Sequence, residues 1–228
     1  MQAVARTRVK ICCISAPDEA ALAVRYGASA LGLVSAMPSG PGVIAEETIA
    51  EIATRVPPGI ASFLLTSLQD ADAIIAQQRR CRTNTLQLVD RVEVSVYARL
   101  RAALPGIGLV QVIHVSGPES LDEACAIAPH VDALLLDSGN QSLEVKDLGG
   151  TGRVHDWRVS RAIREAVDVP LYLAGGLTPL NIGEAIRQVG PFGLDMCSGV
   201  RTNGRLDEAK LAQVMAAVRG EEKVWEAQ

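Results

Sequence analysis

The 228-residue sequence has few aromatic residues, no long hydrophobic run and no block of like charge. Phe, Trp and Tyr make up only 3% of a chain that is 48% hydrophobic, so its core must be aliphatic, as in buried parallel strands. No run approaches the roughly 18 apolar residues of a membrane span, and residues 1–10 are too polar for a signal peptide. We therefore expect a cytoplasmic protein with no membrane partner.

Charge and cysteine usage exclude further classes of protein. The chain has 22 basic and 26 acidic residues, a balance that gives no sign of a nucleic-acid surface. Its five cysteines include no CxxC pair, which argues against a disulfide framework or a zinc knuckle and favours reduced thiols. No two of its three histidines have metal-ligand spacing. We expect no metal and no nucleic-acid partner.

Short apolar runs alternate with longer amphipathic segments along the whole chain. The runs predict strands at residues 9–14, 30–34, 60–65, 85–88, 109–113, 133–136, 171–173 and 193–196. The segments between and after them predict helices at residues 17–26, 46–55, 70–80, 94–103, 119–128, 157–166, 181–189 and 207–218.

This alternation predicts right-handed crossovers and a parallel sheet. We expect an α/β protein with a single domain over residues 1–228, a (β/α)8 TIM barrel with an eight-stranded parallel sheet and a core at about residues 8–220. A doubly wound open sheet is the main alternative. That fold usually carries a glycine fingerprint after its first strand, whereas residues 13–17 contain no glycine.

Three glycine-rich turns, at residues 149–152, 174–177 and 197–199, follow short apolar runs in the last third of the chain. Glycine lets backbone N–H groups approach an anion closely, and barrels often bind phosphate after strands seven and eight. The turns therefore predict a phosphate site, to which Ser198 adds a hydroxyl donor. The alternative is that they are simply tight connections.

Two reactive side chains fall where strands end, which is where barrels carry their active sites. Cys12 ends the first strand, and because alternate residues share a face, Lys10 and Cys12 should point together while Cys13 points away. A neighbouring ammonium favours the thiolate, so this pair could be functional. Both cysteines could instead be small core residues.

The second reactive side chain is Asp137, which ends the sixth predicted strand. It could be a general acid with a raised pKa, or it could cap the following loop through an Asx turn. Asp195, inside the eighth strand, needs a partner if it is buried, and a structural pairing is the alternative to a binding role. The long irregular segment at residues 138–152 could act as a lid.

Together these motifs resemble the phosphoribosylanthranilate isomerase family of tryptophan biosynthesis, over about residues 9–220. The matching pieces are residues 9–12, 27–32, 135–137, 149–152, 156–157, 174–181 and 195–200. The resemblance implies a cofactor-free Amadori rearrangement of a small phosphorylated sugar substrate, with Cys12 as general base and Asp137 as general acid. With the turns, it predicts these substrate- and phosphate-binding residues: Lys10, Gly150, Gly152, Gly175, Gly176, Asp195, Ser198, Gly199 and Arg201.

The chain departs from the family pattern at four places. Cys13 follows the first cysteine, where the family usually has glycine, and residues 87–90 read Gln-Leu-Val-Asp in place of Gln-Leu-His-Gly. The loop at residues 37–42 lacks the arginine that in the family binds the anthranilate carboxylate. Arg201 stands where the family often has an acidic residue, and we expect Arg201 or Arg153 to replace the missing arginine.

These departures leave other functions open. The chain could isomerise a different phosphorylated sugar or aminosugar, or it could be a non-catalytic barrel that binds a phosphorylated ligand. Members of the family are mostly monomers, so the resemblance implies a monomer or a weak homodimer.

Overall fold

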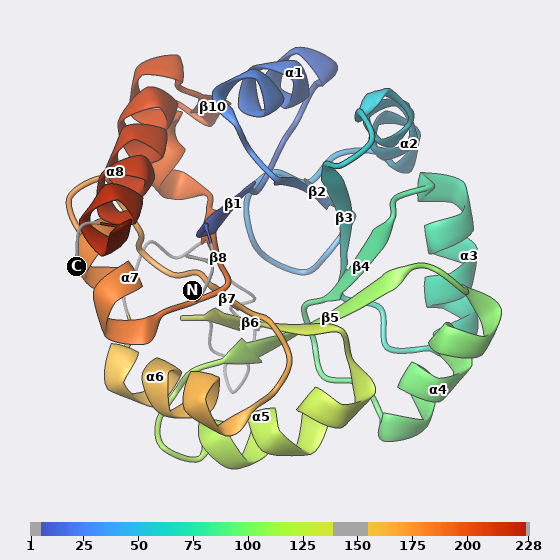
Figure 1. Cartoon of the computed structure of the whole chain (residues 1–228). Helices are drawn as coiled ribbons and strands as arrows, with labels where there is room; N and C mark the ends of the chain where they lie inside the picture. The colour runs from blue at the N-terminus through green and yellow to red at the C-terminus, as the bar shows by residue number, and fades with distance from the viewer. Residues whose placement is uncertain (1–5, 139–154, 227–228) are drawn as a thin grey trace.

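In the computed structural model, eight parallel strands form a closed barrel that is surrounded by a ring of helices (Figure 1). The structure describes residues 6–138 and 155–226. The strands are β1 Arg8–Ile11, β2 Ala30–Val34, β3 Ala61–Thr66, β4 Thr85–Leu88, β5 Gly108–His114, β6 Ala133–Asp137, β7 Leu171–Leu173 and β8 Gly193–Met196. The helices are α1 Pro17–Tyr26, α2 Glu46–Arg55, α3 Ala71–Cys81, α4 Val94–Ala103, α5 Ser120–Ile127, α6 Trp157–Ala166, α7 Ile182–Val189 and α8 Glu208–Glu226.

Each strand pairs in parallel with its neighbour in the chain, and β8 closes the circle on β1. This closure confirms the predicted (β/α)8 barrel and excludes the open-sheet alternative. Across the closing seam, Lys10 lies beside Asp195 and Ile11 beside Met196. A closed parallel barrel brings the carboxyl ends of all eight strands, and the loops that follow them, to one face.

The hydrophobic core has two layers, as alternation along barrel strands requires. The larger layer packs strands against helices and is largely aliphatic, with residues such as Leu31, Leu64 and Leu134 fully buried. The smaller layer fills the barrel interior. Two of the few aromatic residues meet there: the rings of Phe63 and Tyr172 pack edge to face with centroids 5.8 Å apart.

Most predicted element boundaries agree with the structure within two residues. The last helix, predicted to end at residue 218, continues as α8 to Glu226. The first strand also differs. It was predicted to reach residue 14, and it ends at Ile11 because Cys13 adopts a left-handed conformation with φ of 61°. The chain then enters α1, which begins at Pro17 and ends at Gly27 with φ of 101°.

The structure also contains a short antiparallel hairpin that the hydrophobic pattern did not predict. Its strands, β9 Arg201–Thr202 and β10 Arg205–Leu206, follow a single turn of 3-10 helix, η2 Ser198–Val200, and lead into α8. A second 3-10 turn, η1 Ala128–His130, extends α5. A two-residue strand is too short to show the alternation of apolar and polar residues from which strands are predicted.

Within the described residues, no helix is both long enough and apolar enough to span a membrane.

Candidate active site

A pocket opens at the carboxyl ends of the barrel strands. Its lining includes the two residues predicted to carry the chemistry, Cys12 after β1 and Asp137 at the end of β6. The loops after β7 and β8 also contribute to the wall, through Gly175, Gly176 and Ser198. Residues that lie far apart in the sequence are thus collected around one space, as the barrel topology predicts.

Cys12 is buried at the base of this pocket, 6% exposed, and its backbone N–H donates to the Met196 carbonyl at 2.8 Å. Its thiol lies near the Lys10 ammonium, whose pKa the Cys12 charge helps to raise. Gly32 makes room for both side chains, because a Cβ there would stand 2.8 Å from the Cys12 sulfur and 3.0 Å from the Lys10 nitrogen. The predicted pairing of Lys10 and Cys12 on one face is therefore confirmed.

Cys13 was predicted to point away from Cys12, and that prediction is wrong. Its left-handed backbone breaks the strand alternation, so its side chain also lines the pocket, with its sulfur 2.8 Å from that of Cys197 and 3.5 Å from the Pro41 carbonyl oxygen. Interactions with the Cys12 and Cys197 sulfurs, together with burial, raise the pKa of Cys13 well above the usual value. A thiol that stays protonated is a poor base, so Cys13 is unsuited to that role.

Asp137 lies in an environment that raises the pKa of its carboxyl group. Burial raises its pKa above the usual value, against the opposing effects of the Ser138 N–H, which donates to it at 2.7 Å, and of nearby His114. An Asx turn would use the N–H two residues after Asp137. That position, residue 139, lies outside the described residues. His114 lies beside Asp137 in the β5–β6 register, with Nε2 2.9 Å from the Val89 carbonyl oxygen.

Lys10 and Asp195 form an ion pair at 2.9 Å inside the barrel, with side-chain exposures of 0% and 8%. Burial works against the lysine charge, but Asp195 and Cys12 more than offset it and raise the pKa of Lys10. The Lys10 ammonium also lies 5.3 Å from the centroid of the Phe63 ring. Asp195 lines the pocket and Lys10 lies below it, so Lys10 reaches a bound substrate only through its neighbours.

The two late glycine turns lie side by side. Gly175 and Gly176 have φ of 86° and 61°, conformations that suit glycine, and the Asn181 side chain ties this turn by donating to the Gly176 carbonyl at 3.0 Å. A Cβ on Gly199 would stand 2.2 Å from the Leu177 carbonyl oxygen, so the second turn packs directly against the first. Gly150 and Gly152 of the third turn lie outside the described residues, as does most of the segment at residues 138–152.

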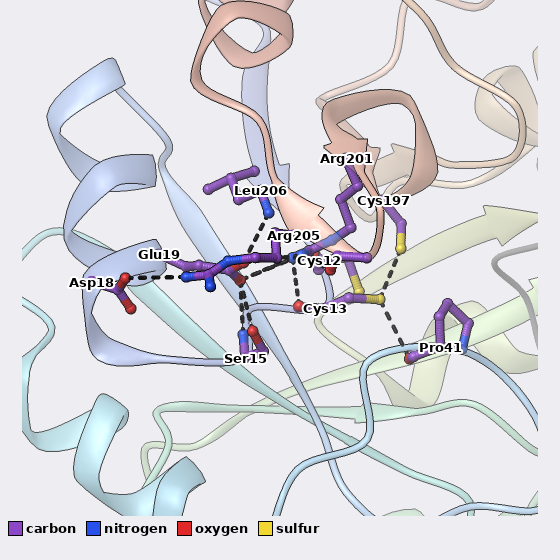
Figure 2. A network of polar contacts seen from close by, with 11 residues as sticks. Cys12, Cys13, Ser15, Asp18, Glu19, Pro41, Cys197, Arg201, Arg205 and Leu206 are labelled. Atoms are coloured by element: carbon purple, nitrogen blue, oxygen red, sulfur yellow. Dashed lines mark hydrogen bonds and ion pairs between the residues drawn. The ribbon is translucent and has the colours of Figure 1, made fainter.

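Arg201 does not line the pocket. Its side chain is 8% exposed and its guanidinium contacts Glu19 and the carbonyl oxygens of Cys12, Cys13 and Gly204 (Figure 2). This geometry argues against the expectation that Arg201 replaces the missing arginine, because both Nη groups are used behind the Cys12–Cys13 turn. Its Nε is buried and has no hydrogen-bond partner among the described residues. Arg153, the other candidate, lies outside the described residues.

The wall formed by β2 to β5 and the loop after β2 is apolar, with Val34, Met37, Leu65, Val89 and Val112 facing the space. No lysine or arginine of the described ranges 6–138 and 155–226 contributes to the pocket lining. An aromatic ring would fit this wall, since its contacts are apolar.

Sequence reasoning gave no role to two residues that the structure singles out. Gln87 is 3% exposed and lines the pocket, and its Oε1 has no hydrogen-bond partner within the described part of the chain. Its inward position on β4 follows from strand alternation, which could have marked it. Glu19 is buried although it occupies the first turn of α1, where an acidic residue is ordinary on a helix surface.

No cluster of three or more His, Cys, Asp or Glu side chains suited to a metal ion occurs among the residues that the structure describes.

Comparison with known proteins identifies the same family along nearly the whole chain. The family model for "N-(5'phosphoribosyl)anthranilate (PRA) isomerase" matches residues 9–217. The chain is 37% identical over 206 residues to N-(5'-phosphoribosyl)anthranilate isomerase 2 of Methanosarcina mazei, covering 90% of each protein. It is 30% identical, with a TM-score of 0.78, to the phosphoribosyl anthranilate isomerase structure from Thermococcus kodakaraensis, covering 93% of this chain and 99% of that one.

A further solved structure bears on the ligand. It is a phosphoribosyl anthranilate isomerase in complex with reduced 1-(o-carboxyphenylamino)-1-deoxyribulose 5-phosphate, 25% identical to this chain with a TM-score of 0.77. The alignment covers 94% of this chain and 99% of that one.

Proposed function

This chain belongs to the N-(5'-phosphoribosyl)anthranilate isomerase family of tryptophan biosynthesis, whose members are isomerases, and we propose that Cys12 and Asp137 carry out its reaction as base and acid. The observation that carries the proposal is that both side chains line one pocket, from strands β1 and β6. The reaction is the Amadori rearrangement of N-(5'-phosphoribosyl)anthranilate to 1-(2-carboxyphenylamino)-1-deoxyribulose 5-phosphate.

Asp137 acts first, as the general acid. It protonates the ribose ring oxygen, the bond from that oxygen to C1 breaks, and the nitrogen lone pair forms an iminium. The raised pKa of Asp137 supports this role, because it keeps the carboxyl protonated over a wider pH range.

Cys12 then acts as the general base. Its thiolate takes the proton from C2, and the electrons of that C–H bond neutralise the iminium to give an enolamine, which tautomerises to the ketone. The Cys12 sulfur and the Lys10 nitrogen lie next to each other beside Gly32, and Cys12 lines the pocket. The raised pKa of Cys13 leaves it unsuited to this step.

The phosphate of the substrate binds at the two adjoining turns that contain Gly175, Gly176, Ser198 and Gly199. Three features support this placement: two of these glycines adopt left-handed backbone, the turns pack against each other, and both lie at the pocket wall. The aromatic ring of anthranilate then lies against the apolar wall of β2 to β5.

Genetic complementation tests this proposal. The gene should restore growth without tryptophan to a bacterial strain that lacks this isomerase, and the purified protein should convert the substrate to the ketone product, identified by NMR. Failure of both assays with a folded protein would contradict the proposal.

One observation favours a second candidate, isomerisation of a different phosphorylated aminosugar. The described pocket lining holds no cation for the anthranilate carboxylate. Activity on phosphorylated aminosugars that lack this carboxylate, together with no activity on the anthranilate substrate, would select this candidate.

A further inference from the structure

The peptide groups that carry Cys12 and Cys13 are held from behind by one guanidinium. Arg201 Nη2 donates to the Cys12 carbonyl oxygen at 3.1 Å and also to the Cys13 carbonyl oxygen (Figure 2). On its other side, Cys12 donates its N–H to Met196 of β8 at 2.8 Å. Both polar groups of the Cys12 backbone are therefore fixed, one by the barrel and one by Arg201.

Arg201 is itself held by the buried carboxylate of Glu19. Nη1 lies 3.3 Å from each carboxylate oxygen, and the two side chains are 8% and 5% exposed. Glu19 also accepts from the backbone N–H groups of Ser15 at 3.0 Å and Leu206 at 2.8 Å. This carboxylate thus joins the loop after β1, helix α1 and the β9–β10 hairpin to the guanidinium.

The Cys12–Cys13 turn needs such support because its conformation is unusual. Cys13 has φ of 61°, a left-handed backbone that disfavours residues with a Cβ. In this conformation the two successive carbonyls point to the same side, where one nitrogen of Arg201 meets both. The two departures from the family pattern, Cys13 and Arg201, are therefore in direct contact.

We infer that Arg201 is a positioning residue, which holds the Cys12–Cys13 turn so that the Cys12 thiol faces the substrate and which does not itself contact the substrate. The inference rests on the proposed function in taking Cys12 as the base. A shift of about 1 Å in a reacting group can reduce turnover about 100-fold, so a change behind the turn is enough to affect the chemistry.

The test replaces the guanidinium and separates kcat from KM. Arg201→Met should lower kcat by about 10- to 100-fold and change KM by less than about threefold, because proton transfer is misplaced while the pocket wall is intact. Arg201→Lys should restore part of the loss, since an ammonium can reach one of the carbonyls. Unchanged kcat in folded Arg201→Met protein would overturn the inference, and so would a rise in KM alone, which would indicate contact with the substrate.

Two further variants keep the test interpretable. Arg205→Met is the matched control, since Arg205 lies on the same hairpin but is 79% exposed and faces Asp18 at 3.8 Å; it should leave kcat unchanged. Glu19→Gln combined with Arg201→Met removes the buried carboxylate that Arg201→Met would leave unpaired. If this double variant folds and recovers the wild-type kcat, the carboxylate charge explains the loss and the inference is wrong.

Alkylation of Cys12 by iodoacetamide, followed by peptide mass spectrometry, separates this inference from the proposed function. Arg201→Met should change the rate at which Cys12 is alkylated at least severalfold. The alkylation rate of the exposed Cys125 serves as the internal reference. If Cys12→Ala retains activity, the proposed role of Cys12 fails even where alkylation still responds to Arg201. An unchanged Cys12 rate in Arg201→Met protein would overturn the inference whatever the activity.

Discussion

The two halves of the pocket mouth differ in chemistry. The half built from β6, β7, β8 and β1 carries Asp137, the glycine turns, the Lys10–Asp195 pair and Cys12. The half built from β2 to β5 presents mainly apolar side chains, with Gln87 as its buried polar exception. The first half contains most of the motifs that match the isomerase family, together with the departures at Cys13 and Arg201, and the second contains the altered loop at residues 37–42 and the altered segment at residues 87–90. Under the proposed function, the acid–base pair lies in the polar half and the aromatic ring of the substrate lies against the apolar half.

The difference has a physical cause. On the polar half the buried charges of Lys10 and Asp195 depend on each other across two strands, so a single change leaves a charge unpaired. On the apolar half, side chains contact the ligand through shape and area, and one can replace another at modest cost. We expect changes in the polar half to have the larger effects.

The largest effect should come from Cys12→Ala. Removing the general base should lower kcat by about 10³- to 10⁴-fold with little change in KM, because general acid–base groups contribute on this scale. Steady-state kinetics measures both constants. Val112→Ala, on the apolar half, provides the comparison and should lower kcat by less than tenfold. A Cys12→Ala enzyme within tenfold of wild type would remove the proposed distinction between the halves.

Asp195→Asn should produce the largest loss of stability. It leaves the Lys10 ammonium buried without its countercharge, which should cost about 3–5 kcal/mol in the free energy of unfolding measured in urea. The exposed pair Glu51–Arg55 provides the control, and Glu51→Gln should cost less than about 1 kcal/mol. Equal losses in the two variants would show that burial of the Lys10–Asp195 pair has no energetic consequence.

Asp137→Asn should lower kcat/KM by about 10²- to 10³-fold, because an amide cannot supply the proton. In the wild type the acid must be protonated, so this group makes kcat/KM fall as the pH rises through its pKa, which burial places above the ordinary value of 3.8. The charge of His114 lowers the pKa of Asp137, so His114→Gln should raise that pKa. The fall in kcat/KM should then occur at higher pH. A pH profile of the two enzymes checks the direction, and a shift to lower pH would contradict the assignment.

The acid stability of the turn behind Cys12 should depend on Glu19. Burial favours the protonated carboxyl, but N–H groups of Leu206 and Ser15 and the charge of Arg201 together lower the pKa of Glu19 below its usual 4.5. The resulting stabilisation is present above pH 4.5 and is lost as the pH falls through the lower folded pKa. Thermal unfolding between pH 3 and pH 7 should therefore show a smaller acid dependence for Glu19→Gln, and an unchanged dependence would contradict this role.

The smallest effect should come from adding charge to the apolar half. Met37→Arg places a cation in the altered loop at the pocket wall, where a partly exposed ion pair with the substrate carboxylate is worth about 0.2–1 kcal/mol. The KM for N-(5'-phosphoribosyl)anthranilate should fall by up to about fivefold at low salt, and Met37→Gln should leave it unchanged. An unaltered KM for Met37→Arg would place the carboxylate elsewhere in the pocket.

Much of the fold follows from local pattern, and the exceptions have identifiable causes. The helix at Pro17–Tyr26 begins at proline and ends before a left-handed glycine, and both signals are local. The early end of β1 was missed because Cys13 adopts a conformation that its residue type disfavours. That conformation depends on contacts with Cys197, Arg201 and Pro41, which lie far away along the chain.

The sequence by itself determined the alternation of strands and helices, the presence of a thiol and a carboxyl at strand ends, and the glycine turns that follow late strands. These properties depend on residue type and spacing over a few positions. Only the tertiary structure decided that Cys13 turns into the pocket, that Lys10 is paired with Asp195, and that Arg201 lies behind Cys12 against Glu19. Three pairs are involved: Cys13 with Cys197, Lys10 with Asp195, and Glu19 with Arg201. The partners in each pair lie more than 180 residues apart in sequence. They meet because β8 pairs with β1 and closes the barrel.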